Sequence, residues 1–436
     1  MIPPSNPAGR QPLFSRYIPT AIAALYLVFA IASVQYDDIT FDEGTHLHYG
    51  IEILKGKADR YRDGIAAFPS TMPVTALNAL PRAAEQVFHP GTKKNDWGAA
   101  DTKSGRYITI FTTLVLLLYC FRFSAMLSSE RTGCIVMLLV AADPNILAHA
   151  RLVTTDVYAA TGFIATLYHL WRWLVQKEAR HFYYWCIAIA LAQVCKANNI
   201  LLYPASFIPM IFFLFRRPGQ FRLRTALWQG LAFVAIQIFI INMCFLFSGP
   251  WTSLSALHVK SAFFQSLQPG WLARIPIPLP KAYIDTFDLI QYERETFEGD
   301  PLTYLNGVLR DKQGFWNYYL VCYALKTPLL SMLISTAGFI YCCAVKKIRA
   351  ASLLQGWLPG GLVLLFLSSS SIQSGYRYLL PVVCLSLIFS AYCLDAALRR
   401  FPRLAFTGLA LIPVLTAVLA FPNYLVYTNP LVHDKK

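Results

Sequence analysis

The sequence predicts an all-α, polytopic membrane protein with a single domain over residues 1–436 and about eleven transmembrane helices. Of the 436 residues, 56% are hydrophobic and only 14% are charged, whereas about 25% of residues are charged in soluble domains. The mean hydropathy is +0.46. The apolar residues form long runs bounded by charges, as expected for helices that cross a hydrocarbon core.

Eleven apolar runs have nearly the length that a membrane-spanning helix needs. Their approximate limits are 17–35, 107–126, 132–148, 157–175, 182–197, 199–215, 225–248, 318–345, 353–369, 377–397 and 404–421. The first run is followed by Gln35, Tyr36 and Asp37 and lacks the cleavage pattern of a signal peptide. We therefore interpret it as a retained span.

Basic residues in the short gaps between runs predict the orientation. The formal net charge is +15. One alternating set of gaps holds Arg10, Arg16, Arg122, Arg131, Arg172, Lys177, Arg180, Arg216, Arg217, Arg222, Arg224, Lys346, Lys347, Arg349, Arg399, Arg400 and Arg403. Since Lys and Arg are enriched in cytoplasmic loops, we expect a cytoplasmic N-terminus. This distribution favours the lipid bilayer as the partner and gives no indication of nucleic acid.

Two long loops, 36–106 and 249–317, then lie on the outer side. They are too long to be simple connectors, and we expect structured elements in both, with helix-like stretches at Glu43–Leu54 and Val74–Val87. All ten cysteines lie in or beside apolar runs, so no disulfide framework is expected. The tail Pro422–Lys436 would also lie outside, and we expect no C-terminal soluble domain.

An acidic pair follows the first span within the stretch Phe41–Gly50. Asp42 and His46 would share one face of a helix at the i, i+4 spacing. A carboxylate in a partly apolar cleft can act as a general base. The alternative is that Asp42 and Glu43 only stabilise the start of a helix through its dipole. His46 and His48 could hold a metal with nearby carboxylates, but their spacing is not a specific metal signature.

A second acidic position is Asp156, at the end of the polar stretch that starts at Asp143 and at the beginning of an apolar run. An ionisable residue near the centre of a span costs roughly 2.5–3.5 kcal/mol, so such residues usually pair or act. The alternative is that Asp156 is the N-cap of the next span.

Three cations, Lys196, Lys326 and Arg377, lie at span ends on the predicted outer side. They oppose the positive-inside bias, and a cation in this position could bind a phosphate or pyrophosphate. The alternative is that their side chains only reach toward lipid headgroups.

These residues resemble the GT-C superfamily of glycosyltransferases, specifically the dolichyl-phosphate-mannose protein mannosyltransferase and aminoarabinose transferase type. The resemblance covers most of the chain and rests on the order of short motifs. They are Asp42–Glu43, Ala148–Asp156, Pro276–Pro280, Tyr304–Gly307, Lys326–Pro328 and Tyr376–Pro381. It implies a GT-C-like helix bundle that transfers a sugar from a polyprenyl-phosphate donor to an extracytoplasmic acceptor, commonly with inversion.

The resemblance also implies roles for individual residues. Asp42 would be the general base, Glu43 would position it or bind the acceptor, and Asp156 would shape the site or hold a cation. The candidate ligands of the donor phosphate are Lys196, Lys326, Arg377 and Arg151. The candidate substrate-binding residues are His46, Tyr376 and Tyr304. No organic cofactor is expected; a divalent metal, with His46 and Asp156 as its possible ligands, stays open.

The sequence departs from the family pattern at Phe68–Val74, where many relatives have His-Pro-Pro-Leu. The identity of the acceptor and of the sugar therefore does not follow from the resemblance. The alternative function is a transporter or flippase of lipid-linked saccharides, which would usually place ionisable groups near the midplane and show repeat symmetry. The compact length and short basic loops favour a bacterial inner membrane with the site on its periplasmic or extracellular side.

Overall fold

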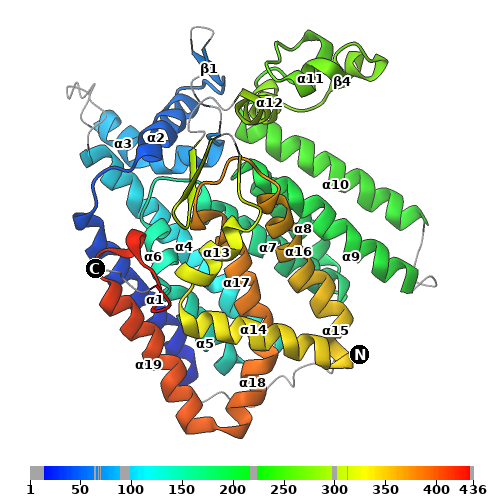
Figure 1. The fold of residues 1–436 in the computed structure, drawn as a ribbon. Helices are drawn as coiled ribbons and strands as arrows, with labels where there is room; N and C mark the ends of the chain where they lie inside the picture. The colour runs from blue at the N-terminus through cyan, green and yellow to red at the C-terminus, as the bar shows by residue number, and fades with distance from the viewer. Residues whose placement is uncertain are drawn as a thin grey trace.

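The computed structural model shows a helix bundle with a cap of shorter elements at one end (Figure 1). The structure describes residues 14–62, 65, 66, 68, 70–88, 99–216, 223–296, 302–311 and 313–432. The helices of the bundle are α1 (Phe14–Ser33), α4 (Ala99–Leu127), α5 (Glu130–Ala141), α6 (Pro144–Ala150), α7 (Asp156–Leu174), α8 (Arg180–Gln193), α9 (Leu202–Arg216), α10 (Leu223–Cys244), α13 (Tyr318–Lys326), α14 (Leu329–Ala344), α15 (Lys346–Ser352), α16 (Leu358–Ser368), α17 (Leu380–Phe389), α18 (Ala391–Arg400) and α19 (Pro402–Ala420). Short helical turns precede or follow several of them: η3 (Ala197–Leu201), a π-helical turn η7 (Leu353–Trp357), η8 (Tyr376–Leu379) and η9 (Tyr424–Val426).

Each of the eleven predicted runs contains helix, but several are broken or short. Among the described residues, five helices are long and apolar enough to cross a membrane, or up to eight if each bent pair counts as one span. The sharpest bend, 119°, separates α13 from α14 at Thr327–Pro328, where proline cannot continue the preceding helix. The protein is therefore an integral, multi-pass membrane protein with fewer straight spans than apolar runs.

Two segments form the cap at one end of the bundle (Figure 1). The first contains η1 (Val34–Tyr36), α2 (Phe41–Leu54), β1 (Tyr61–Arg62), β2 (Ile65–Ala66), η2 (Pro73–Thr75) and α3 (Ala76–Phe88). The second contains β3 (Thr252–Ser253), η5 (Leu254–Ala256), α11 (Ala262–Leu267), η6 (Trp271–Arg274), β4 (Pro276–Ile277), α12 (Lys281–Thr296), β5 (Leu302–Leu305) and β6 (Val308–Asp311). The strands form three antiparallel pairs, β1–β2, β3–β4 and β5–β6. Helices α2 and α3 coincide with the two helical stretches predicted in the first loop.

Arg60 joins the two cap segments. It is fully buried, and its Nε donates to the carbonyl of Ala282 at 3.0 Å while Nη1 donates to the carbonyl of Phe68 at 2.8 Å. The guanidinium also lies 4.8 Å from the centre of the Tyr49 ring. Because these groups belong to α2, the segment after it and α12, the cap packs as one structure.

Helix α17 lies at the centre of the bundle (Figure 1), and all ten of its residues are buried. Phe389 packs edge to face against Phe123 of α4 and Trp171 of α7, with ring centres 5.4 Å apart in both pairs. By contrast, α9, α10 and α19 expose many large apolar side chains, as expected for helices that face lipid.

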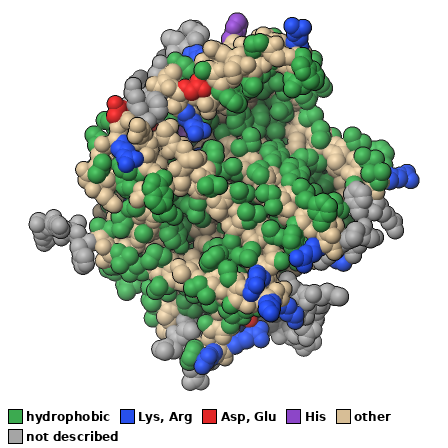
Figure 2. All heavy atoms as spheres, turned by 45° about the vertical axis from the view of Figure 1, so that its right-hand side comes forward, with side chains coloured by type: hydrophobic (Ala, Val, Ile, Leu, Met, Phe, Trp, Pro, Cys, Tyr) green, Lys and Arg blue, Asp and Glu red, His purple; other side chains and the backbone are tan. Residues whose placement is uncertain are grey.

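The cap and the basic gaps lie at opposite ends of the bundle. Helix α15 and the turn between α18 and α19 lie away from the cap (Figure 1), and they carry Lys346, Lys347, Arg349, Arg399 and Arg400. Figure 2 shows Lys and Arg side chains gathered along the lower edge of the molecule. The structure thus places the two long loops and these basic residues at opposite ends of the bundle. Which end is cytoplasmic stays a prediction.

Candidate active site

Glu43 fixes the start of α2. Its Oε2 accepts from the backbone N–H of Thr40 at 2.9 Å, as in a capping box. The carboxylate is fully buried and forms an ion pair with Arg106 of α4, at 2.9 Å from Nε and 2.7 Å from Nη2. Its Oε1 also accepts from the N–H of Val153 at 2.9 Å. Both oxygens are therefore used within the protein, so the geometry favours Glu43 as a positioning group over an acceptor-binding one.

Asp42 is adjacent to Glu43 in α2, but its side chain pairs with a different arginine. Its carboxylate is about one-third exposed and forms an ion pair with Nη1 of Arg377. The Nε of Arg377 donates to the carbonyl of Ser374 at 3.1 Å. Gly375, between them, has φ +82° and ψ −172°, a conformation that is essentially restricted to glycine. This turn aims the Arg377 side chain toward α2.

Asp156 and Lys196 form a second ion pair next to the first. Asp156 is the buried first residue of α7, and Lys196 immediately precedes η3. The Lys196 ammonium also lies 3.8 Å from the centre of the Tyr378 ring, which is a cation–π contact. Arg377 interacts electrostatically with Asp156 as well as with Asp42. Two carboxylates and two cations thus alternate in one cluster.

A narrow cavity of about 30 Å³ opens beside this cluster. One part of its wall is polar and includes Asp156, Lys196 and Arg377; the rest is largely apolar. Phe163 of α7 and Leu367 of α16 belong to the apolar part. This volume is about that of one water molecule, so the cavity marks the place where the charged cluster meets apolar side chains.

Two buried histidines face the same charges. His46 lies one helical turn after Asp42, and His149 lies at the end of α6. Both interact electrostatically with Asp156, Lys196 and Arg377. The Nδ1 atom of each has no hydrogen-bond partner among the described residues. Burial lowers the pKa of His46 to about 4, so its imidazole is neutral at pH 7.

Two of the predicted phosphate ligands, Arg151 and Lys326, contact the carboxy-terminal segment at Pro422 and Leu425 instead. Arg151 forms an ion pair with Asp37 at 2.5 Å and donates to the carbonyl of Pro422 at 3.1 Å. Lys326 donates from Nζ to the carbonyl of Leu425 at 3.0 Å. Arg151 therefore links the end of α1 to Pro422, and Lys326 holds the turn at Leu425. Because both side chains have these partners, the phosphate role fits them less well than it fits Lys196 and Arg377.

The two predicted substrate-binding tyrosines do not line the cavity. Tyr376 is buried, and its hydroxyl is 2.9 Å from Oγ1 of Thr327 at the break between α13 and α14. Tyr304 is exposed on strand β5. Their role in binding substrate stays a prediction.

A metal site is not formed by the side chains that the structure describes. In those residues, no group of three or more His, Cys, Asp or Glu side chains could hold a metal ion. His46 and Asp156, the possible metal ligands, face each other near Lys196, which neutralises the Asp156 carboxylate.

Sequence reasoning missed Arg106, His149 and Tyr378. Arg106 stands at the edge of an apolar run, where it resembles any flanking cation. His149 lies seven residues before Asp156, within the Ala148–Asp156 motif on which the resemblance rests. Its position in that motif could have marked it as a candidate site residue. Only the packing of α4, α6 and η8 reveals which groups these side chains meet.

The comparisons with known proteins bear on the fold. A family model described as dolichyl-phosphate-mannose-protein mannosyltransferase matches residues 98–245, about a third of the chain. Among solved structures, ArnT from Cupriavidus metallidurans bound to undecaprenyl phosphate superposes with a TM-score of 0.55 at 13% identity, covering 94% of this chain and 65% of that one. No curated protein sequence matches the chain.

A second similar structure is the oligosaccharyltransferase AglB from Archaeoglobus fulgidus in complex with an inhibitory peptide and a dolichol-phosphate. Its TM-score is 0.57 at 13% identity, covering 94% of this chain and 56% of that one. The chain has the GT-C fold. The GT-C bundle here spans about three-fifths of the length of the solved structures that it matches.

Proposed function

We propose that this protein is a membrane glycosyltransferase that moves a sugar from a polyprenyl-phosphate donor to an acceptor on the outer side of the membrane. The observation that carries the proposal is the cluster of Asp42, Arg377, Asp156 and Lys196 beside a narrow cavity with largely apolar walls. The GT-C fold supports it, and the ArnT and AglB structures contain undecaprenyl phosphate and dolichol-phosphate. A bacterial inner membrane is part of the proposal.

The donor phosphate would bind between Lys196 and Arg377. A phosphate oxyanion accepts strong hydrogen bonds from a guanidinium, so it competes with Asp42 for Arg377. Asp156 would keep Lys196 oriented toward the phosphate. The polyprenyl chain would leave the site along the apolar wall that includes Phe163 and Leu367.

Donor binding would thereby release Asp42 for catalysis. Its carboxylate would accept the proton of the acceptor hydroxyl while the acceptor oxygen bonds to the anomeric carbon. The bond from that carbon to the phosphate oxygen breaks, and the electron pair leaves with the polyprenyl phosphate. Lys196 and Arg377 stabilise the charge of this leaving group. A single displacement of this kind inverts the anomeric centre.

Replacing Asp42 tests this proposal. We expect Asp42→Asn to lower the transfer rate by about 10²–10⁴-fold, the usual contribution of a general base. The measurement is single-turnover transfer from a polyprenyl-phosphate sugar by purified protein in liposomes. Glu85→Gln, which removes an exposed carboxylate of α3, is the matched control.

Turnover of Asp42→Asn at the wild-type rate would remove Asp42 as the base. A wild-type protein that moves labelled lipid-linked saccharide across the liposome membrane without transferring the sugar would instead favour a flippase.

A further inference from the structure

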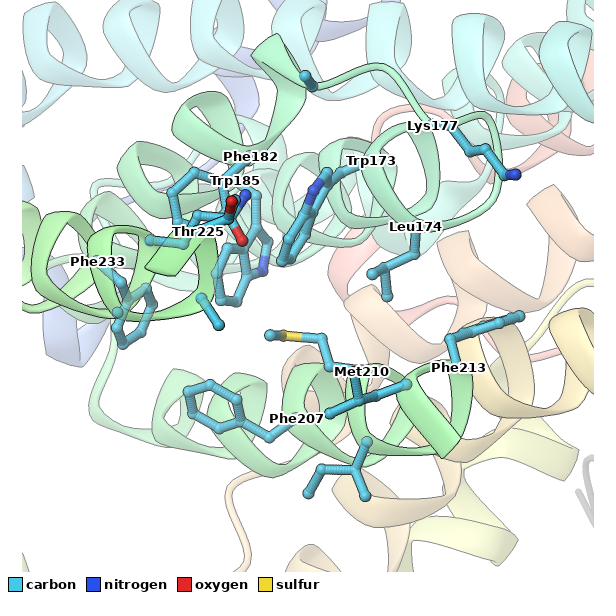
Figure 3. Close-up of a pocket in the computed structure, with 16 residues that line it drawn as sticks. Trp173, Leu174, Lys177, Phe182, Trp185, Phe207, Met210, Phe213, Thr225 and Phe233 are labelled. Atoms are coloured by element: carbon cyan, nitrogen blue, oxygen red, sulfur yellow. The ribbon is translucent and has the colours of Figure 1, made fainter. Parts of the chain in front are cut away.

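A second cavity, of about 580 Å³, lies between α7, α8, α9 and α10 (Figure 3). Its lining is mostly aromatic and aliphatic, and Figure 3 shows Trp185, Phe207, Met210 and Phe233 around the open space. This volume is within the range of about 300–1,000 Å³ that is typical of ligand pockets. Because the cavity lies between helices that expose apolar side chains, an apolar chain from the bilayer can enter it.

This cavity is separate from the candidate active site. Asp156, at the start of α7, lines the narrow cavity, whereas Trp173 and Leu174, at the end of the same helix, line the larger one. Helix α7 has 19 residues, and a rise of 1.5 Å per residue separates its two ends by about 27 Å. The larger cavity thus lies near the opposite face of the membrane.

The helices around the cavity leave it accessible to lipid. Helix α9 packs on α7, η7 and α16, whereas α10 packs mainly on α8. The two helices meet where Tyr203 donates to Gln237 at 3.1 Å and where the rings of Phe207 and Phe233 lie 5.7 Å apart, and the cavity lies between them from there toward Leu214 and Thr225. Ile211 on α9 and Leu231 on α10 are 53% and 61% exposed. Because these outer surfaces face the hydrocarbon region, the molecule next to the opening is a lipid of the bilayer.

The rim of the cavity is positively charged. Lys177 lines it and has no ion-pair partner among the side chains that the structure describes. Arg216 ends α9, two residues beyond the lining residue Leu214. Its guanidinium lies 4.9 Å from the centre of the Phe212 ring, which does not line the cavity, so Arg216 would have to turn to reach a headgroup at Lys177. The nearby Glu178 is paired with Arg172 at 2.6 Å, and no described carboxylate lines the cavity.

We propose that this cavity binds an anionic phospholipid of the bilayer, with one acyl chain between α9 and α10 and the phosphate at Lys177 and Arg216. Basic pockets between transmembrane helices on the cytoplasmic side are suited to anionic headgroups. A zwitterionic lipid would fill the apolar part equally well, but it would bring an amine to the same basic rim. The bound chain would fill the space between α9 and α10 beyond the contact of Phe207 with Phe233.

Two variants separate the apolar and the charged parts of the proposed site. A Cβ at Gly230, on the wall of the cavity, would meet no atom within 4 Å, so Gly230→Leu is the substitution chosen to reduce the volume of the cavity. Gly361→Leu on α16, which also has open space at its Cβ, is the matched control. Lys177→Ala with Arg216→Ala removes the rim charges, and Lys346→Ala with Arg349→Ala removes two exposed charges of α15 at the same end of the bundle.

The experiment measures retention of phosphatidylglycerol and phosphatidylethanolamine by native mass spectrometry of the full-length protein from an equimolar mixture. We expect wild-type protein to retain phosphatidylglycerol at least about 10-fold better than phosphatidylethanolamine, in line with one charge-assisted contact. Gly230→Leu should lose both lipids, and the rim variant should lose the preference. Both controls should behave as wild type.

Retention of phosphatidylglycerol at the wild-type level by both test variants would overturn the proposal. So would an equal loss of preference in the α15 control, because the attraction would then be a general surface effect. Displacement of phosphatidylglycerol by equimolar undecaprenyl phosphate would also overturn it, since the cavity would then belong to the carrier lipid. None of these outcomes depends on sugar transfer.

Discussion

Adjacent residues of the acidic pair have opposite environments. Glu43 is fully buried against Arg106 and Thr40, whereas Asp42 is partly exposed and meets Arg377, a residue that borders the narrow cavity. The contact of Glu43 with the N–H of Thr40 fits the helix-start explanation, and the catalytic role of Asp42 stays a prediction. The sequence could not separate them, because the distinction depends on where α4 and η8 place two arginines.

Glu43→Gln should destabilise the protein. The substitution keeps the shape of the side chain but leaves the buried Arg106 without its counter-ion, and breaking a buried pair costs about 3–5 kcal/mol. Thermal unfolding in detergent should therefore shift to markedly lower temperature, while Glu85→Gln should unfold as wild type does. An unchanged midpoint for Glu43→Gln would show that Glu43 does not anchor α2.

His46 should make the stability depend on pH. Burial lowers the pKa of His46 to about 4, below its usual value near 6.5. The unfolded chain therefore binds more protons between these values, so the contribution of the neutral imidazole is present above pH 6.5 and decreases as the pH falls toward 4. The loss should amount to about 2 kcal/mol between pH 7.5 and pH 5.

Thermal unfolding of wild type and His46→Gln across this pH range measures that contribution. The substitution should flatten the profile below pH 6.5. Parallel profiles for the two proteins would show that His46 is not held neutral by its surroundings.

At the scale of elements, α2 is positioned by a close contact with η2. A Cβ at Gly50 would clash with the carbonyl of Thr75, whereas a Cβ at Gly44, in the first turn of the same helix, would meet nothing within 4 Å. The sequence predicted α2 from its pattern, but not this contact, because a glycine in a helix gives no sign of what lies against it.

Gly50→Ala should therefore push α2 away from η2 and cost about 1–3 kcal/mol, the usual penalty of overpacking. Because α2 carries Asp42, sugar transfer should fall as well. Gly44→Ala is the control from the same helix and should be neutral or slightly stabilising, since alanine favours a helix over glycine. Equal unfolding midpoints for the two variants would contradict the close packing of α2 on η2.

At the scale of the molecule, the apolar runs predicted where the helices lie, because burial in a bilayer makes long hydrophobic segments necessary. They did not predict the breaks at Asp143–Pro144 and Thr327–Pro328, where local proline chemistry interrupts an otherwise apolar run. Lys196 and Arg377 could be selected from the sequence because cations on the predicted outer side oppose the positive-inside bias, and Asp42 and Asp156 because they are carboxylates beside apolar runs. Arg151 and Lys326 carry the same signal, and only tertiary packing shows that both hold the carboxy-terminal segment.

The affinity of the purified protein for undecaprenyl phosphate shows whether the Asp42–Arg377–Asp156–Lys196 cluster binds the phosphate of a polyprenyl donor. Arg377→Ala removes a charge-assisted contact and should weaken binding by about 10–100-fold. Arg274→Ala, an exposed arginine of the cap, should bind as wild type. An unchanged affinity in Arg377→Ala would show that Arg377 does not bind the donor phosphate.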